Sequence, residues 1–155
     1  MIIRFIKSLI KFALYIVFVA AAVYFTPIIL SRVLDTPYPL ATITSGSMWP
    51  VLQENDLVLM RGAKGSDVKI GEIIIFENQK GFTIHRLIRK EKDPSAPLGT
   101  SKLVTKGDAN NVEDQPIEES AVIGRIIYFR DKPLRFPKLG FIARHIGPQI
   151  QNLTN

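Results

Sequence analysis

The feature that most constrains this chain is a long apolar run near its amino terminus. From Phe12 to Ser31 the sequence contains no charged residue, and a helix of about 20 residues spans the hydrocarbon core of a bilayer. The run is longer than the apolar core of a signal peptide, and no Ala-x-Ala cleavage pattern follows it. A buried helix of a soluble protein is rarely apolar on every face. We therefore predict a retained transmembrane helix, with Pro27 placed where a kink or an early stop is tolerable.

Basic residues lie unevenly around this run. Arg4, Lys7 and Lys11 precede it, whereas only Arg32 follows directly. The positive-inside rule then predicts a cytoplasmic amino terminus and an extracytoplasmic remainder. The formal net charge of +6 fits contact with membrane lipid better than nucleic acid, because basic residues cluster beside the span and in the carboxy-terminal tail and no nucleic-acid motif accompanies them.

Length and composition limit the number of domains and the kinds of functional site. The 155 residues suffice for one modest domain plus an anchor. The absence of cysteine excludes disulfides, thiolate metal sites and a cysteine nucleophile, and we expect no cofactor and no metal. We predict an anchor over residues 1–35, an extracytoplasmic domain over 36–131 and a basic amphipathic tail over 132–155.

The predicted outer domain is mainly β. Short runs rich in Val, Ile, Leu and Phe alternate with turn residues, and no long helical period appears among them. In "GFTIHRLIRKE" the alternation places His85 and Leu87 on one side and Ile84 on the other. The expected strands cover residues 40–44, 56–62, 71–78, 81–91, the start of the segment from 102, and 121–130 as the last.

The tail has a different pattern. Leu139, Ile142 and Ile146 follow a helical spacing, and Gly147 with Pro148 should end such a helix after about two turns. Two interpretations stay open, a terminal helix packed on the sheet and a short helix lying in the bilayer interface.

The segment "SGSM" places Ser45 and Ser47 in a glycine-containing turn, just past the membrane span. A sharply bent backbone can present a serine hydroxyl as nucleophile beside an amide N–H that faces the reacting carbonyl. An ordinary turn between two strands would have the same composition.

A nucleophilic serine needs a base, and the chain has two histidines. His145 lies in the tail beside Arg144, whereas His85 lies in a β-rich stretch where a histidine contributes little to packing. Asp108 and Asp114, both in "KGDANNVEDQ", could orient a histidine, although each would also suit a self-capping polar turn.

These segments, taken in order, resemble type I signal peptidases, the membrane-bound serine proteases that remove signal peptides. "SGSMWP" resembles the family's SGSMxP box, "DLVLM" and "GEIIIFEN" the two strand boxes after it, "IHRL" the box of the general base, "TKGDANNVEDQ" the GDxN box and "VIGRI" the next strand. The matches span roughly residues 42–127. The resemblance implies an antiparallel signal-peptidase-like β domain with one amino-terminal transmembrane helix.

The branch of the family follows from the base box. Bacterial enzymes carry lysine there, whereas His85 resembles the Ser-His-Asp branch of the endoplasmic reticulum, archaea and some Gram-positive bacteria. This resemblance implies that Ser47 is the nucleophile, His85 the general base, and Asp114 or Asp108 the carboxylate that orients it. It also implies oxyanion donors from the Ser47 amide and the Ser45 hydroxyl.

The function implied by the resemblance is removal of signal peptides from secretory preproteins at the cell membrane or the endoplasmic reticulum membrane. Some relatives have a second, carboxy-terminal span that this sequence does not show, so we expect an accessory membrane subunit or the tail to take its place. Two alternatives stay open. One is a protease of the same fold with a dedicated substrate such as a pilin-like precursor, and the other is a non-catalytic anchored β domain within a membrane complex. Self-cleaving repressors share the fold but are soluble and use lysine.

Overall fold

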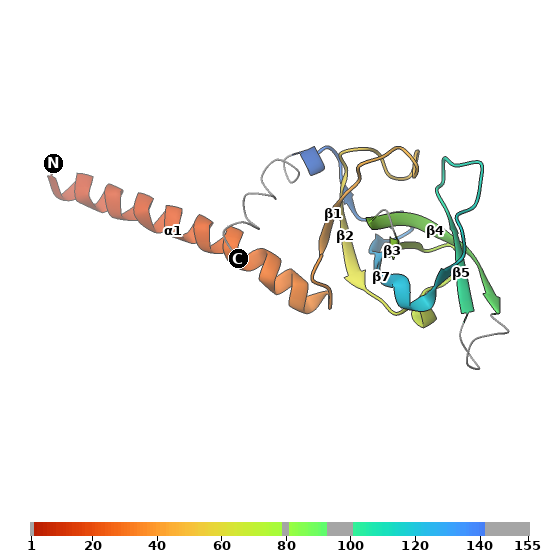
Figure 1. Ribbon diagram of the computed structural model, residues 1–155. Helices are drawn as coiled ribbons and strands as arrows, with labels where there is room; N and C mark the ends of the chain where they lie inside the picture. The colour runs from red at the N-terminus through yellow and green to blue at the C-terminus, as the bar shows by residue number, and fades with distance from the viewer. Residues whose placement is uncertain (1, 79–80, 93–100, 142–155) are drawn as a thin grey trace.

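The computed structural model describes residues 2–78, 81–92 and 101–141. A long helix projects from a β domain (Figure 1). Its elements are α1 (Ile2–Val33), β1 (Leu40–Thr42), β2 (Leu57–Gly62), the 3₁₀ turn η1 (Gly65–Asp67), β3 (Ile73–Asn78), β4 (Gly81–Lys92), β5 (Ser101–Lys106), β6 (Ile117–Glu118), the 3₁₀ turn η2 (Glu119–Ala121), β7 (Val122–Ile126), β8 (Tyr128–Phe129), β9 (Lys132–Pro133) and β10 (Arg135–Phe136).

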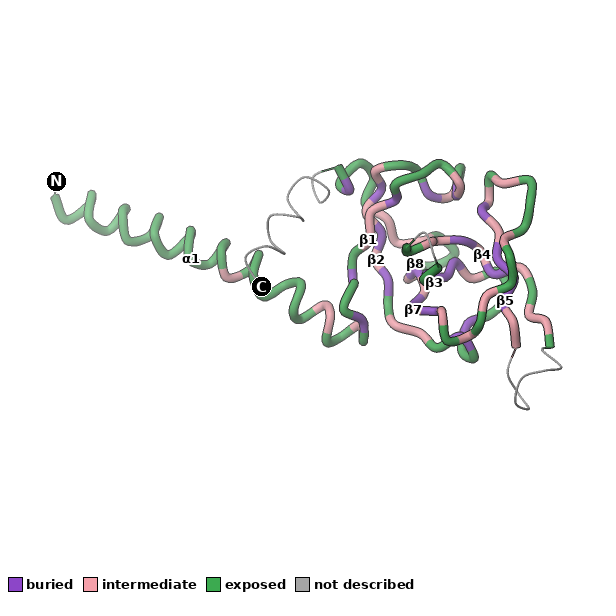
Figure 2. Tube along the Cα trace, in the orientation of Figure 1, coloured by how far each residue is buried: buried purple, intermediate pink, exposed green. Residues whose placement is uncertain are grey.

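Helix α1 has almost no protein around it. None of its residues is buried within the described chain, and nearly all of them are exposed (Figure 2). A soluble protein would not leave so large an apolar surface in water. The helix continues through Pro27 to Val33, so the early stop that the sequence allowed does not occur. The predicted transmembrane helix is confirmed.

The end of α1 is fixed to the β domain by local hydrogen bonds. The Ser31 hydroxyl donates to the Thr36 carbonyl at 2.7 Å, and the Thr36 amide donates to the Ser31 carbonyl at 3.1 Å. Asp35 between them takes a left-handed conformation with a φ of +49°, which is a common way to end a helix. The Gly62 amide then donates to the Leu34 carbonyl at 2.8 Å. The anchor and β2 therefore meet at a built junction rather than through a loose linker.

The main sheet runs in the order β1-β2-β7-β3-β4-β5-β6, with β10 also paired to β2, and its described pairings are antiparallel. Strand β3 is central, and its continuous apolar sequence serves both faces. Ile73 and Ile75 pack in one cluster with Met48, while Ile74 and Phe76 pack in a second with Leu87. The prediction of a mainly antiparallel β domain is confirmed.

Strand β4 pairs with different neighbours along its length. Residues 81–86 pair with β3, and residues 86–92 pair with β5. Within the described chain, the second edge of residues 81–85 has no strand beside it, and β1 pairs with β2 alone. The predicted alternation is correct, because Leu87 lies in the second cluster and Ile84 packs against the first.

The carboxy-terminal part of the β domain differs from the sequence prediction. The expected last strand over 121–130 is two strands, β7 and β8, and β9 and β10 follow it. The break lies at Ile127, whose amide donates to the Leu59 carbonyl while its carbonyl accepts from the Leu134 amide. Strands β9 and β10 lie beyond the predicted boundary at 131, and that boundary stays a prediction. The tail helix predicted around Ile142 and Ile146 falls outside the described residues.

Packing beneath β4 should carry much of the stability of the β domain. Leu87 is fully buried two residues after His85, whereas Ile70 is 62% exposed. We expect Leu87→Ala to lower the free energy of unfolding by about 2–5 kcal/mol, because it leaves a cavity in the core. Ile70→Ala should change it by less than about 0.5 kcal/mol. Urea unfolding of the full chain in detergent, followed by Trp49 fluorescence, measures both, and equal effects would contradict this account of the core.

Candidate active site

The turn that carries Ser47 is fixed to the core by the next residue, Met48. Met48 is 1% exposed and belongs to the first apolar cluster. Two backbone hydrogen bonds between residues close in sequence hold the turn. The Trp49 amide donates to the Gly46 carbonyl at 3.0 Å, and the Leu52 amide donates to the Met48 carbonyl at 2.9 Å. A Cβ added at Gly46 would meet nothing within 4 Å. The space beside the turn is therefore open, as an approaching substrate backbone requires.

Three of the predicted site residues form a hydrogen-bonded line. The distance from His85 Nε2 to Ser47 Oγ is 3.1 Å, and that from His85 Nδ1 to Asp114 Oδ2 is 2.5 Å. His85 is 8% exposed and its ring contacts Phe76 edge-on at 6.5 Å between centroids. A serine, an imidazole and a carboxylate in this order are arranged for proton transfer from the hydroxyl to the ring. The catalytic roles themselves stay predictions.

Asp114 is held by a residue that sequence reasoning missed. The Thr105 hydroxyl donates to Asp114 Oδ2 at 2.7 Å, and the Asp114 amide donates to the Thr105 carbonyl at 2.8 Å. Thr105 is fully buried on β5. A threonine in a strand is common, so the sequence alone does not mark Thr105 as a partner of Asp114. Its place opposite Leu87 in the β4–β5 register is visible only in the structure.

Asp108, the other predicted carboxylate, lies against Arg86 and not against His85. The Arg86 guanidinium donates to both carboxylate oxygens, at 2.7 and 2.6 Å, and to the Gly71 carbonyl at 2.7 Å. The hydrogen bonds that Arg86 donates to Asp108 raise the pKa of Arg86 above its ordinary value. A two-pronged pair of this kind fixes the geometry of both groups. In the described chain Asp108 therefore ties the loop after β5 to β4.

That loop contacts the predicted nucleophile through its backbone. The Ala109 amide donates to the Ser47 carbonyl at 2.8 Å, and the Asn110 amide donates to the Gly107 carbonyl at 3.0 Å. A Cβ on Gly107 would lie 2.6 Å from the Ser47 carbonyl oxygen. Glycine at this position allows the loop to approach the serine turn. The motif "GDAN" thus positions Ser47 as well as supplying Asp108.

Ser45 lies beside Ser47. Their hydroxyl oxygens are 3.1 Å apart. The Ser47 amide donates to no acceptor in the described residues. Both predicted oxyanion donors therefore lie at the serine turn.

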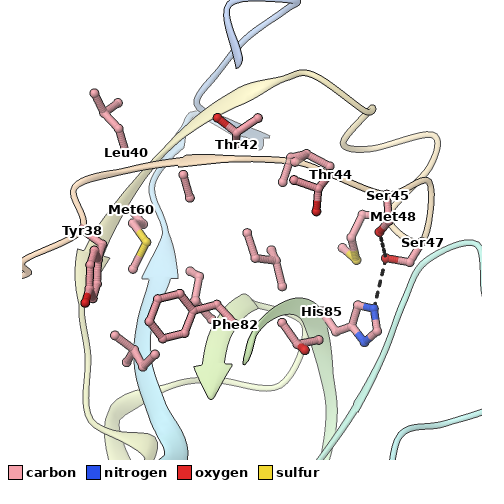
Figure 3. A pocket seen from close by; sticks show the side chains of 16 residues that line it. Tyr38, Leu40, Thr42, Thr44, Ser45, Ser47, Met48, Met60, Phe82 and His85 are labelled. Carbon is pink, nitrogen blue, oxygen red and sulfur yellow. Dashed lines mark hydrogen bonds between the residues drawn. The ribbon is translucent and has the colours of Figure 1, made fainter. Parts of the chain in front are cut away.

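A groove of about 400 Å³ leads away from this site. Ser47 and His85 lie at one end and Tyr38 with Phe82 at the other (Figure 3). The aromatic rings of that pair are 5.2 Å apart between centroids. The groove follows β1 and the unpaired edge of β4, with mostly apolar side chains between these ends that include Leu40, Ile43, Met48, Met60, Ile75, Ile84 and Ile123.

The described residues do not meet the requirements of a metal site. Among them, no group of three His, Cys, Asp or Glu side chains lies together as a metal ion requires. His145, the second histidine, falls outside the described residues.

Comparison with known proteins supplies a family. No protein-family profile matches the chain. It is 33% identical over 129 residues to the signal peptidase complex catalytic subunit SEC11 of Metarhizium acridum, covering 74% of this chain and 67% of that protein. It is 39% identical over 126 residues to SEC11 of Leptosphaeria maculans and 35% identical over 126 residues to sec11 of Pyrenophora tritici-repentis, each covering 74% of this chain and 66% of the relative.

The chain belongs to the SEC11 family of signal peptidase complex catalytic subunits. It spans about two thirds of the length of the curated relatives it matches. The predicted resemblance to the endoplasmic-reticulum branch of type I signal peptidases is confirmed.

The geometry predicts that Asp114, and not Asp108, sets the tautomer of His85. Asp114 contacts Nδ1, so the neutral ring should carry its proton there and accept from Ser47 through Nε2. Asp114→Asn should reverse this tautomer, because the new amide can donate to Nδ1. The matched change Asp108→Asn should leave it intact. The ¹⁵N chemical shifts of the His85 ring, measured on the full chain in micelles, report the tautomer. All variants carry His145→Gln, so that only one histidine gives a signal. A tautomer that changes in Asp108→Asn but not in Asp114→Asn would assign the orienting role to Asp108.

Proposed function

We propose that this chain is a serine-type signal peptidase that removes signal peptides from exported preproteins at the membrane. The observation that carries the proposal is the line from Ser47 through His85 to Asp114, placed at the end of an apolar groove in a SEC11 family member. Ser47 acts as the nucleophile, His85 as the general base and Asp114 as the carboxylate that orients the ring.

The reaction follows from these contacts. Ser47 Oγ attacks the carbonyl carbon of the scissile bond while His85 Nε2 accepts its proton. The imidazolium is stabilised by Asp114 on the other nitrogen, and it gives the proton to the departing amine. The signal peptide is then held as an ester on Ser47. Water, activated by the same ring, hydrolyses that ester and restores the hydroxyl.

The charge that develops on the substrate oxygen needs donors. The Ser47 amide makes no other hydrogen bond in the described chain, and the Ser45 hydroxyl lies 3.1 Å from the Ser47 hydroxyl. In this proposal both donate to the oxyanion. Donors fixed before the reaction stabilise the transition state without reorganising during it. The hydrogen bond from Ala109 to the Ser47 carbonyl supports that fixed geometry.

The groove suits an extended peptide. Strand β1 on one side and residues 81–85 of β4 on the other each have an edge without a strand partner in the described chain. A substrate strand could pair with either edge and place alternate side chains into the apolar floor. Tyr38 follows the end of α1 by five residues (Val33 to Tyr38). We propose that the peptide enters at this end and presents small side chains, such as those of an Ala-x-Ala site, beside Ser47.

The location and partners belong to the same proposal. The family's name and the apolar helix support a single-pass protein of the endoplasmic reticulum membrane. Arg4, Lys7 and Lys11 support an amino terminus in the cytoplasm, with the β domain on the other side. Its partners would be signal peptides, lipid and the further subunits that the word complex in the relatives' names implies. The name "catalytic subunit" argues against a non-catalytic β domain.

The proposal is tested by measuring how fast variants of the full chain in lipid vesicles cleave a preprotein with an Ala-x-Ala site. Ser47→Ala and His85→Ala should abolish cleavage, and Asp114→Asn should lower kcat about 10⁴-fold, because the imidazole takes the wrong tautomer. Ser45→Ala should cost about 10²–10³-fold, the usual effect of losing one oxyanion donor. Ser120→Ala changes an exposed serine that does not line the groove and serves as the control.

Each alternative gives a different result. Equal cleavage by all variants would overturn the assignment of the site. Cleavage of a single dedicated substrate, with the same variant pattern but no action on Ala-x-Ala sites, would favour a protease with another task. Matched folding of every variant is checked by its thermal unfolding.

A further inference from the structure

A second pocket lies where the chain leaves the membrane. The uncharged run ends at Ser31 and the helix at Val33. With the edge of the hydrocarbon core taken at Ser31, a rise of about 1.5 Å per residue puts Asp35 about 6 Å beyond it. The headgroup layer is about 5–8 Å thick on each side. The hydrogen bond from the Gly62 amide to the Leu34 carbonyl fixes this depth for the end of β2 as well.

The pocket has a volume of about 250 Å³ and is lined by the helix end together with charged side chains from separate parts of the β domain. Arg61 comes from β2, Asp67 from η1 and Arg125 from β7, while Asp35 belongs to the junction itself. Gly62 at its base has no room for a side chain, because a Cβ would lie 1.9 Å from the Asp35 carbonyl oxygen. The junction that fixes the anchor therefore also forms the pocket.

The charged side chains that line this pocket form no ion pair with one another within the described residues. Arg125 already pairs with Glu72 at 3.0 and 3.1 Å. Within the described residues, Arg61 and Asp35 make no side-chain hydrogen bond or ion pair, and Asp67 accepts only from Ser66. One available guanidinium and two available carboxylates thus share a polar pocket at headgroup depth.

We propose that this pocket binds the headgroup of a zwitterionic phospholipid. The planar guanidinium of Arg61 matches a phosphate, on which it can place two parallel N–H donors. Asp35 and Asp67 supply the acceptors for the ammonium end, which lies two carbon atoms from the phosphate oxygen. An anionic lipid would satisfy Arg61 and be repelled by the carboxylates, so the site discriminates between the two lipid classes. The proposal is independent of peptidase activity, because the groove shares no residue with this pocket.

Native mass spectrometry of the full chain in detergent tests the site by counting retained lipid. Phosphatidylethanolamine and phosphatidylglycerol are added separately at equal concentrations. We expect phosphatidylethanolamine to bind about tenfold more tightly, and Arg61→Gln to reduce its affinity about tenfold through loss of the charge-assisted pair. Lys69→Gln removes the same charge from an exposed residue outside the pocket and should leave binding unchanged.

The carboxylate side of the site is tested by Asp35→Asn and Asp67→Asn. Asparagine tolerates the left-handed conformation of residue 35, so the junction should fold. Both variants should lose the preference for phosphatidylethanolamine while retaining phosphatidylglycerol, a difference that general destabilisation cannot produce. Equal binding of both lipids by the unaltered chain would overturn the proposal. Displacement of lipid by millimolar inorganic phosphate, but not by glycerophosphoethanolamine, would instead mean a free-anion site and would also overturn it.

Discussion

The change of partner along β4 at Arg86 is the constraint on which the rest of the site depends. Before Arg86 the strand pairs only with β3, which leaves one edge of residues 81–85 open to the groove. From Arg86 onward it pairs with β5, where Thr105 holds Asp114, the residue of the following loop that contacts His85. A free strand edge and a supported imidazole therefore lie within a few residues of one strand.

The loop after β5 then connects the two halves of the site. Asp108 holds it to β4 through Arg86, the Ala109 amide holds the Ser47 carbonyl, and Asp114 contacts His85. These contacts come from three different residues of one short loop. A change in the loop should therefore affect the position of Ser47 and the orientation of His85 together.

Much of this arrangement could be predicted from the sequence, because the signals are local. The uncharged run fixed the helix prediction, and the alternation around His85 predicted which side chains of β4 enter which cluster. The choice between Asp108 and Asp114 could not be made, since both lie in the same polar loop and only the pairing of Arg86 separates them. The buried Thr105 and the steric role of Gly107 depend on tertiary neighbours in the same way.

The short strands near the carboxy terminus show the same limit of local patterns. Strands β8, β9 and β10 have two residues each, too few for a period to appear. Strands β8 and β9 pair with each other, whereas β10 pairs with the distant β2, and the Leu59 amide donates to the Leu134 carbonyl between β9 and β10. The apolar residues of 121–130 predicted one strand because local pattern contains no information about that distant partner.

Both pockets are built around the path of the chain out of the membrane. The hydrogen bond between Gly62 and Leu34 fixes the position of β2 relative to the end of α1. Tyr38 then lies at the end of the groove away from Ser47. A peptide leaving the bilayer beside α1 would thus meet the aromatic pair first and Ser47 last. In this account the anchor determines which bond of a membrane-embedded peptide can reach the nucleophile.

The most direct test replaces the proposed attacking atom, Ser47 Oγ. The chain contains no cysteine, so Ser47→Cys introduces a single thiol at the proposed nucleophile. The account predicts that this variant cleaves a preprotein slowly in lipid vesicles and loses all cleavage in proportion to alkylation at residue 47, while the unaltered chain is unaffected by the reagent. Cleavage that persists after complete alkylation of Cys at this position would show that another group attacks the peptide bond and would contradict the account.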